Sequence, residues 1–173
     1  MDFDLAKSIP ILVQTPRVLA ALVGDLPIEW ANTNDGANTW SAYDVVGHLI
    51  HGEKTDWMPR VRRILEKGRS VPFDTFDRTA QFVESRGKSL RDLLKEFTEL
   101  RTGNVRALEA LHLTASDMRR EGMHPQLGVV NMGQLLATWV AHDLNHIRQV
   151  AEVMARQYRE AVGPWKEFLP IMG

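Results

Sequence analysis

The chain has 173 residues, of which 44% are hydrophobic and 25% charged, a composition typical of a single globular domain that would span residues 1–173. Lys and Arg number 21 against 22 Asp and Glu, and this balance gives no general attraction to nucleic acid or to an acidic membrane surface. The absence of cysteine excludes disulfides, thiolate metal ligands and a cysteine nucleophile.

The sequence contains no recognisable targeting or membrane-spanning segment. Its first residues lack a basic stretch followed by an apolar run, and no segment of about 18 uninterrupted apolar residues occurs. The most basic run, Arg60-Val-Arg62-Arg63, is interrupted and has helical spacing, so we interpret it as a solvated helix face. We therefore expect a cytoplasmic protein with neither nucleic-acid nor membrane partners.

The first predicted helix runs from about Asp4 to Val23, with its apolar residues on one broad face. Pro10 is tolerable in the first turns, whereas Pro16 should kink the helix or split it in two. Residues 31–39 are rich in Asn, Thr and Gly and predict a loop.

The second predicted helix begins after Ser41, a good N-cap, with an aspartate three residues later that makes a weak capping box. We expect it to continue to Gly68, with a bend at Pro59. Residues 69–88 are less regular and predict at most a short helix near Arg78–Glu84.

Two more long helices are predicted in the second half of the chain. One begins after Ser89 and ends near His112, and the other begins after Asn131 and ends near Tyr158. The polar segment Thr114–Gly128 between them reads as a crossing loop. Together the four segments predict four long amphipathic helices.

The tail Gly163–Pro170 predicts a short turn of helix whose Trp165 and Phe168 cover one end of the molecule. No segment alternates convincingly between polar and apolar residues, so we predict no sheet. Helices of roughly 20 to 28 residues in this number predict an all-α four-helix bundle.

The segment Trp139-Val-Ala-His142-Asp-Leu-Asn-His146 places two histidines four residues apart in a helix, so both imidazoles can face one ion. A third ligand is needed, and His48 is the best candidate because it lies in a second long helix. Three neutral imidazoles would leave one coordination position open for water or substrate, which is the mark of a catalytic site.

Two observations bear on this metal-site hypothesis. Apolar residues frame the histidine pair, and a buried imidazole needs a hydrogen-bond partner or a metal, although such pairs also arise by chance. His51 lies one turn beyond His48 on nearly the same face, so spacing alone does not exclude it as the third ligand. If it is not a ligand, His51 could support a ligand, shuttle protons or lie on the surface.

The other ionisable candidates have a structural interpretation as well. Glu53 and Asp56 follow His48 along the helix and could reach a metal-bound water, but a solvated or ion-paired role is favoured. Asp143 should face solvent because it is turned about 100° from His142. His112 and His124 fall at a helix end and in a loop, where we expect exposure.

The sequence combines Trp40-Ser41, then His48-Leu49, with His142-x3-His146 in the last long helix. In this combination the chain resembles the DinB/YfiT-like superfamily over essentially its whole length. The resemblance implies a bundle with two long crossover connections and a divalent metal, often zinc or nickel, on His48, His142 and His146. Its register thus favours His48 over His51. The family's frequent His-Arg-Gly-Gln is replaced here by His146-Ile-Arg-Gln149, which affects the expected pocket more than the ligands.

The resemblance further implies a homodimer that acts on a small molecule, as a metal-dependent S-transferase using a low-molecular-weight thiol such as bacillithiol, mycothiol or glutathione. Such an enzyme would serve detoxification or stress response. A metal-dependent hydrolase is the nearest alternative, since imidazole ligands preserve the Lewis acidity of the ion. Two other hypotheses remain: a non-catalytic bundle that is only stabilised by metal, and a helical dimerisation protein without metal. The sequence leaves open whether the protein is an enzyme. It also leaves the metal open, because three imidazoles suit several metals.

Overall fold

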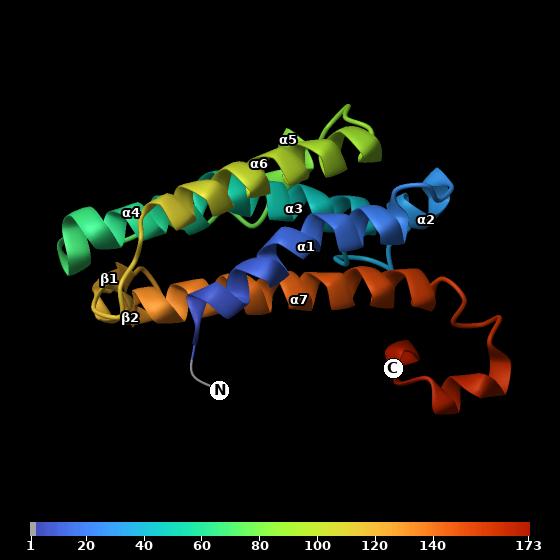
Figure 1. Cartoon of the computed structure of the whole chain (residues 1–173). Coiled ribbons are helices and arrows are strands. Elements are labelled where there is room, and N and C mark those ends of the chain that lie inside the picture. Colours follow the sequence, from blue (N-terminus) through green and yellow to red (C-terminus); the bar gives the residue numbers. More distant parts are fainter. Residues whose placement is uncertain (1–2) are drawn as a thin grey trace.

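The computed structural model describes residues 3–173 and has four long helical segments packed side by side as a bundle (Figure 1). The elements are α1 (Leu5–Val23), α2 (Ile28–Asn32), α3 (Ala42–Thr55), α4 (Trp57–Lys67), α5 (Gln81–Glu84), α6 (Leu90–Ala110), β1 (Glu121–His124), β2 (Gly128–Asn131) and α7 (Met132–Arg156). Short 3-10 turns cover Gly68–Ser70, Asp117–Arg119, Gly163–Phe168 and Pro170–Met172. Helix α3 packs against α6 and α7, and α1 closes the bundle against the same two helices. The predicted all-α bundle with long crossover connections is confirmed.

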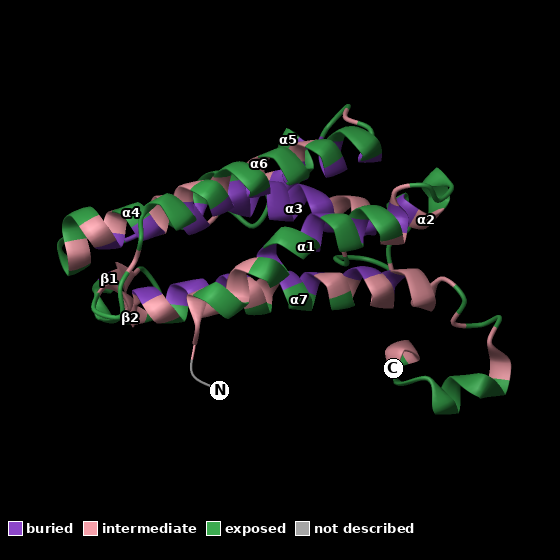
Figure 2. Ribbon diagram, viewed as in Figure 1, coloured by how far each residue is buried: buried purple, intermediate pink, exposed green. Residues whose placement is uncertain are grey.

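Three of the long helices begin where the sequence predicts, because each start is encoded locally. Each has a complete capping box, in which the two side chains bond each other's backbone N–H: Ser41 with Asp44, Ser89 with Asp92, and Asn131 with Gln134. These boxes satisfy backbone donors that a helix start otherwise leaves without partners. Helix α3 is then buried along much of its length (Figure 2).

Helix α1 is continuous through Pro10 and Pro16, so the prediction that Pro16 splits it is wrong. A proline lacks the N–H that would bond the carbonyl four residues earlier, which for Pro16 is the carbonyl of Leu12. In the bundle this carbonyl accepts a hydrogen bond from Arg101 of α6, at 2.8 Å from Nη1. The guanidinium of Arg101 therefore replaces the backbone N–H that Pro16 cannot provide.

By length and composition alone, α1 could also cross a membrane, with a mean hydropathy of 1.2 over its most apolar window. The core helix of a bundle meets the same criteria. Here 28% of that window is buried, and Leu12, Leu19 and Val23 are among the core residues.

The helix predicted from Ser41 to Gly68 is two helices, because the chain breaks at Asp56 between α3 and α4. Pro59 lies in the first turn of α4, and the residue four positions before it is Thr55, the last residue of α3. Proline favours the first turn of a helix and clashes with the carbonyl four residues back. It therefore starts a new helix here rather than bending one. The end at Gly68 is confirmed, and its φ of 56° suits glycine.

The predicted absence of a sheet is wrong, since β1 and β2 pair antiparallel from Glu121↔Asn131 to His124↔Gly128. Each strand has only four residues, too few for an alternating pattern to emerge. Gly122 lets the hairpin approach the bundle closely, since a Cβ there would come within 2.7 Å of the Phe73 ring. The backbone N–H of Phe73 also donates to the Met123 carbonyl, so the α4–α5 loop is fastened to the hairpin.

The C-terminal tail lies beside the end of α7 and is held by Arg156, which donates to the carbonyls of Ile171 and Gly173. The predicted turn of helix is present. The prediction that Trp165 and Phe168 cover one end of the bundle is wrong, because these side chains are 70% and 75% exposed.

Candidate metal centre

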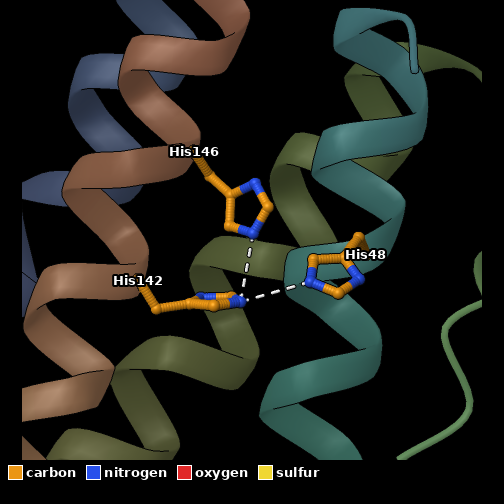
Figure 3. Close-up of side chains that lie close together, drawn as sticks. All are labelled: His48, His142 and His146. Carbon is orange, nitrogen blue, oxygen red and sulfur yellow. Dashed lines mark hydrogen bonds between the residues drawn. The ribbon is translucent and has the colours of Figure 1, made fainter. Parts of the chain in front are cut away.

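The fold brings together three histidines from two helices. His48 projects from α3, and His142 and His146 project from successive turns of α7 toward it (Figure 3). The Nε2 atom of His142 lies 3.2 Å from that of His48 and 3.1 Å from that of His146. Within the described part of the chain, this is the group of side chains whose donor atoms could hold a metal ion, all within 4.8 Å of one another.

The donor chemistry of this cluster fits a divalent transition metal. Imidazole nitrogens placed ~2.0–2.1 Å from a tetrahedral ion are ~3.3 Å apart, close to the two separations of 3.1 and 3.2 Å that involve His142. A neutral imidazole has one N–H, so the Nε2 atom of His142 can donate to one neighbour but not to both. A shared cation would satisfy all three lone pairs at once.

Burial keeps these imidazoles in the form that can bind a metal. It lowers the pKa of His48 to about 3 and that of His142 to about 2, with a further contribution from the neighbouring histidines. Burial likewise lowers the pKa of His146, against an opposing effect of Gln149. All three rings are therefore neutral at pH 7, with a lone pair available on one nitrogen.

Gln149, one turn after His146, orients that ring. Its Oε1 lies 2.7 Å from Nδ1 of His146, so Nδ1–H donates to the amide and Nε2 faces the cluster without a proton. The Nδ1 atoms of His48 and His142 are buried and have no hydrogen-bond partner within residues 3–173. In the sequence, Gln149 stands out only as part of a family pattern; its spacing of three residues from His146 is the signal for this role.

His51, the competing candidate for the third ligand, lies outside the cluster. Its Nδ1 is 3.1 Å from Oε1 of Glu84 on α5, and its ring packs against Phe76. It is only 6% exposed, so the surface interpretation is wrong for this residue. Side chains three residues apart in a helix differ in direction by about 60°. This difference is enough to direct His51 toward α5 while His48 faces α7.

Behind the histidines lies a buried ionic network that sequence analysis missed. Arg101 of α6 donates to Oε1 of Glu53 at 2.8 Å from Nη2 and to Oδ1 of Asp143 at 2.9 Å. All three side chains are at most 1% exposed, so the prediction that Asp143 faces solvent is wrong, whereas the ion-paired interpretation of Glu53 is confirmed. The available signal was the position of Arg101, four residues after Phe97 and four before Val105 on the apolar face of α6.

Asn104 and Trp139 complete this network by donating to Glu53, at 3.0 Å from the amide nitrogen and 3.2 Å from the indole nitrogen. Burial by itself lowers the pKa of Arg101, but the two carboxylates more than offset it, so the pKa is raised and the guanidinium stays charged. Glu53 and Asp143 are thus held as partners of Arg101 and do not face the histidine cluster as bases.

A cavity of about 500 Å³ opens onto the histidines. Its inner wall includes Trp40, whose ring centroid is 4.7 Å from that of His48 and which stacks at 12° to His146. Its outer wall includes the α4–α5 loop and the hairpin. The prediction that His124 of the hairpin is exposed is wrong, because this residue lines the cavity and is half-buried. His112, by contrast, is exposed as predicted.

Comparison with known proteins agrees with this architecture. The sequence pattern of the DinB superfamily matches residues 11–150. No curated protein matches the chain significantly. Among solved structures, YfiT from Bacillus subtilis, described as a probable metal-dependent hydrolase with an unusual four-helix bundle topology, superposes with a TM-score of 0.72 at 22% identity, over 88% of this chain and 86% of that one. At this identity, the likeness to YfiT concerns the fold alone. The family pattern, by contrast, matches most of the sequence, and the chain therefore belongs to the DinB superfamily.

Proposed function

We propose that this protein is a metal-dependent enzyme that transfers a low-molecular-weight thiol to a small electrophile. The observation that carries the proposal is the convergence of three neutral imidazoles, with Nε2 atoms 3.1 and 3.2 Å apart, at a cavity of about 500 Å³. A site that only stapled the bundle would be closed, whereas this cluster is accessible from a space large enough for a small molecule.

His48, His142 and His146 would hold the ion through Nε2. A divalent ion bound by neutral ligands supplies Lewis acidity, which lowers the pKa of a water or thiol that reaches it. Gln149 keeps the His146 ring in the required tautomer, and Trp40 shields two of the rings from bulk water. In the net reaction, sulfur forms a bond to an electrophilic carbon, the leaving group departs with its electron pair, and the thiol proton passes to solvent.

The disposition of carboxylates favours a thiol over water as the nucleophile. A free thiol has a pKa of about 8.5 and water one of about 15.7, so the same Lewis acid would ionise a thiol more completely than water at neutral pH, and water benefits more from a general base beside it. Glu53 and Asp143 both form buried ion pairs with Arg101. Asp56, which lines the cavity, is paired with Arg60 at 2.5 Å.

Metal-dependent hydrolysis is the second candidate. It is favoured by the description of YfiT, and by Asp56, the carboxylate on the cavity wall. Burial raises the pKa of Asp56, although Arg60 opposes this effect, and a raised pKa suits a group that exchanges protons near neutral pH. Release of Asp56 from Arg60 on substrate binding would be required.

The experiment begins with elemental analysis of tag-free protein beside the His48→Ala/His142→Ala/His146→Ala variant. We expect about one transition metal per chain in the wild type and none in the folded variant. The loaded protein is then assayed with 1-chloro-2,4-dinitrobenzene and a panel of bacillithiol, mycothiol, glutathione and cysteine, and separately with p-nitrophenyl acetate. Thiol-dependent turnover that the variant lacks supports the transferase; ester hydrolysis without any thiol turnover would replace it with the hydrolase; metal binding with neither activity would contradict both.

A further inference from the structure

The cavity beside the histidines has walls that are mostly apolar and aromatic. The apolar residues that line it include Trp57, Phe73, Phe76, Leu127, Val130 and Leu135. A volume of about 500 Å³ lies in the range of small-molecule sites, and such walls favour a ligand with an apolar body. The hairpin and the α4–α5 loop that provide many of these residues are fastened together by the Phe73–Met123 hydrogen bond, so the outer wall is preformed.

Two arginines line this cavity, and their electrostatic situations differ. Arg60 is compensated, because its Nε lies 2.5 Å from Oδ1 of Asp56 and both side chains are nearly buried. Its guanidinium also lies over the ring of Phe73, 5.2 Å from the centroid. Arg60 is therefore a wall residue whose charge is already balanced.

Arg78 has no such partner: within residues 3–173, no carboxylate oxygen comes within 4 Å of its guanidinium. The two aspartates of its own loop are engaged elsewhere. Asp74 pairs with Arg63 at 2.8 Å, and Asp77 accepts from the backbone N–H and hydroxyl of Thr79 at 2.8 and 2.7 Å. The cavity thus carries one cation without a counter-ion.

Arg78 lines the same cavity as the histidine cluster, because the residues around this space include His48, His142 and His146 as well as Arg78. A ligand anion bound by Arg78 inside the cavity would therefore share it with the cluster. Arginine presents donors in a planar fork that matches a carboxylate in two parallel hydrogen bonds.

We propose that the cavity binds a small organic anion with an aromatic or branched apolar body, and that Arg78 recognises its carboxylate. The inference rests on the proposed function in that it takes this cavity as the substrate site. Arg78 would orient the molecule with its apolar body against Phe76 and Trp57 and its reactive end toward the histidines. A neutral molecule of the same shape would lack this attachment.

The test measures binding without catalysis, on chelator-treated protein, so that no metal can coordinate the carboxylate. Phenylacetate and its neutral analogue phenylacetamide are titrated by NMR into the wild type, Arg78→Gln, Arg78→Lys and Arg62→Gln. Arg62 is an exposed α4 arginine that does not line the cavity and is the matched control. Metal uptake of each preparation is measured separately, so a failed metal site and a failed anion site give different results.

We expect phenylacetate to bind the wild type at least about fivefold more tightly than phenylacetamide, and Arg78→Gln to remove this preference. Arg78→Lys should retain part of it, and Arg62→Gln all of it. Cavity resonances, including those of Trp57 and Phe76, should shift. Equal binding of the two probes by the wild type, an unchanged preference in Arg78→Gln, or no binding of either probe would each overturn the proposal.

Discussion

Arg101 and Asp143 form a buried ion pair between α6 and α7, with 2.9 Å between Nη2 and Oδ1. Asp143 directly follows His142, so the pair lies immediately behind the histidine cluster. The same guanidinium bonds Glu53 of α3 and the Leu12 carbonyl of α1. One side chain thereby joins all four long helices of the bundle at the level of the candidate metal centre.

Removal of Arg101 should therefore be costly. We expect Arg101→Ala to lower the free energy of unfolding by about 3–5 kcal/mol, because Glu53 and Asp143 would remain buried without a partner. Urea denaturation of the metal-free protein measures this. Arg91→Ala, at an exposed position of the same helix, should change the free energy by less than about 0.5 kcal/mol. Similar small losses in both variants would contradict a stabilising network.

Metal affinity should follow the geometry of the cluster. We expect His142→Ala and His146→Ala each to abolish tight binding, and His48→Ala to weaken binding far more than His51→Ala, because His51 is directed toward Glu84. Competition with a chromophoric chelator gives the affinities. If His142→Ala or His146→Ala still bound one metal per chain, the site assignment would be wrong. If His51→Ala lost more metal affinity than His48→Ala, His51 would be the third ligand.

Gln149 should matter without touching the metal. Gln149→Ala removes the acceptor that fixes the Nδ1 proton of His146, so we expect metal affinity to fall by about 10–100-fold, with Gln149→Glu retaining most of it. Arg148→Ala is the control, because that side chain is largely exposed and bonds Asn145 and Glu152. The same chelator competition applies; equal affinity of Gln149→Ala and wild type would show that the ring needs no such support.

The buried histidines also predict how the stability of the metal-free protein depends on pH. His48 and His142 have pKa values of about 3 and 2 when folded, against about 6.5 when unfolded. Below pH 6.5 the unfolded chain therefore binds protons that the folded chain does not, and stability falls as pH falls. Well below that value, each histidine contributes a slope on the order of 1 kcal/mol per pH unit.

Urea denaturation between pH 7.5 and 5 tests this slope. The double variant His48→Leu/His142→Leu should be less sensitive to acid than the wild type over this range. His112→Gln, at an exposed position, should have the wild-type profile. If the double variant and the wild type lose stability in parallel, the low pKa values of the two histidines are wrong.

Two helical glycines should respond oppositely to alanine. At Gly47 a Cβ would collide with the Ser85 hydroxyl and lie 3.3 Å from Cβ of Gln81, so alanine would force both neighbours on α5 to shift. At Gly103 of α6, a Cβ would have no atom of residues 3–173 within 4 Å apart from its chain neighbours and the backbone of its own helix. We expect Gly103→Ala to stabilise the fold by about 0.5–1 kcal/mol and Gly47→Ala to destabilise it. Thermal unfolding measures both; stabilisation by Gly47→Ala would contradict the close contact.

Much of the helical framework could be predicted because its signals are local. A capping box needs only two residues three positions apart, and Ser41, Ser89 and Asn131 each begin a helix as expected. The juxtaposition of His142 and His146 likewise follows from the helical period alone. The hairpin was missed because four-residue strands carry too little pattern, and their pairing depends on contacts with α4 and its loop.

By itself, the sequence determined where most helices begin, which residues face the core, and that two histidines share one face of the last helix. Only the tertiary structure decided that α1 passes intact through Pro16, that Asp143 and Glu53 pair with Arg101, and that His48 rather than His51 meets the α7 pair. The physical reason is the same in each case. A hydrogen bond or ion pair between helices depends on their packing angle and rotation, which no spacing along one helix specifies.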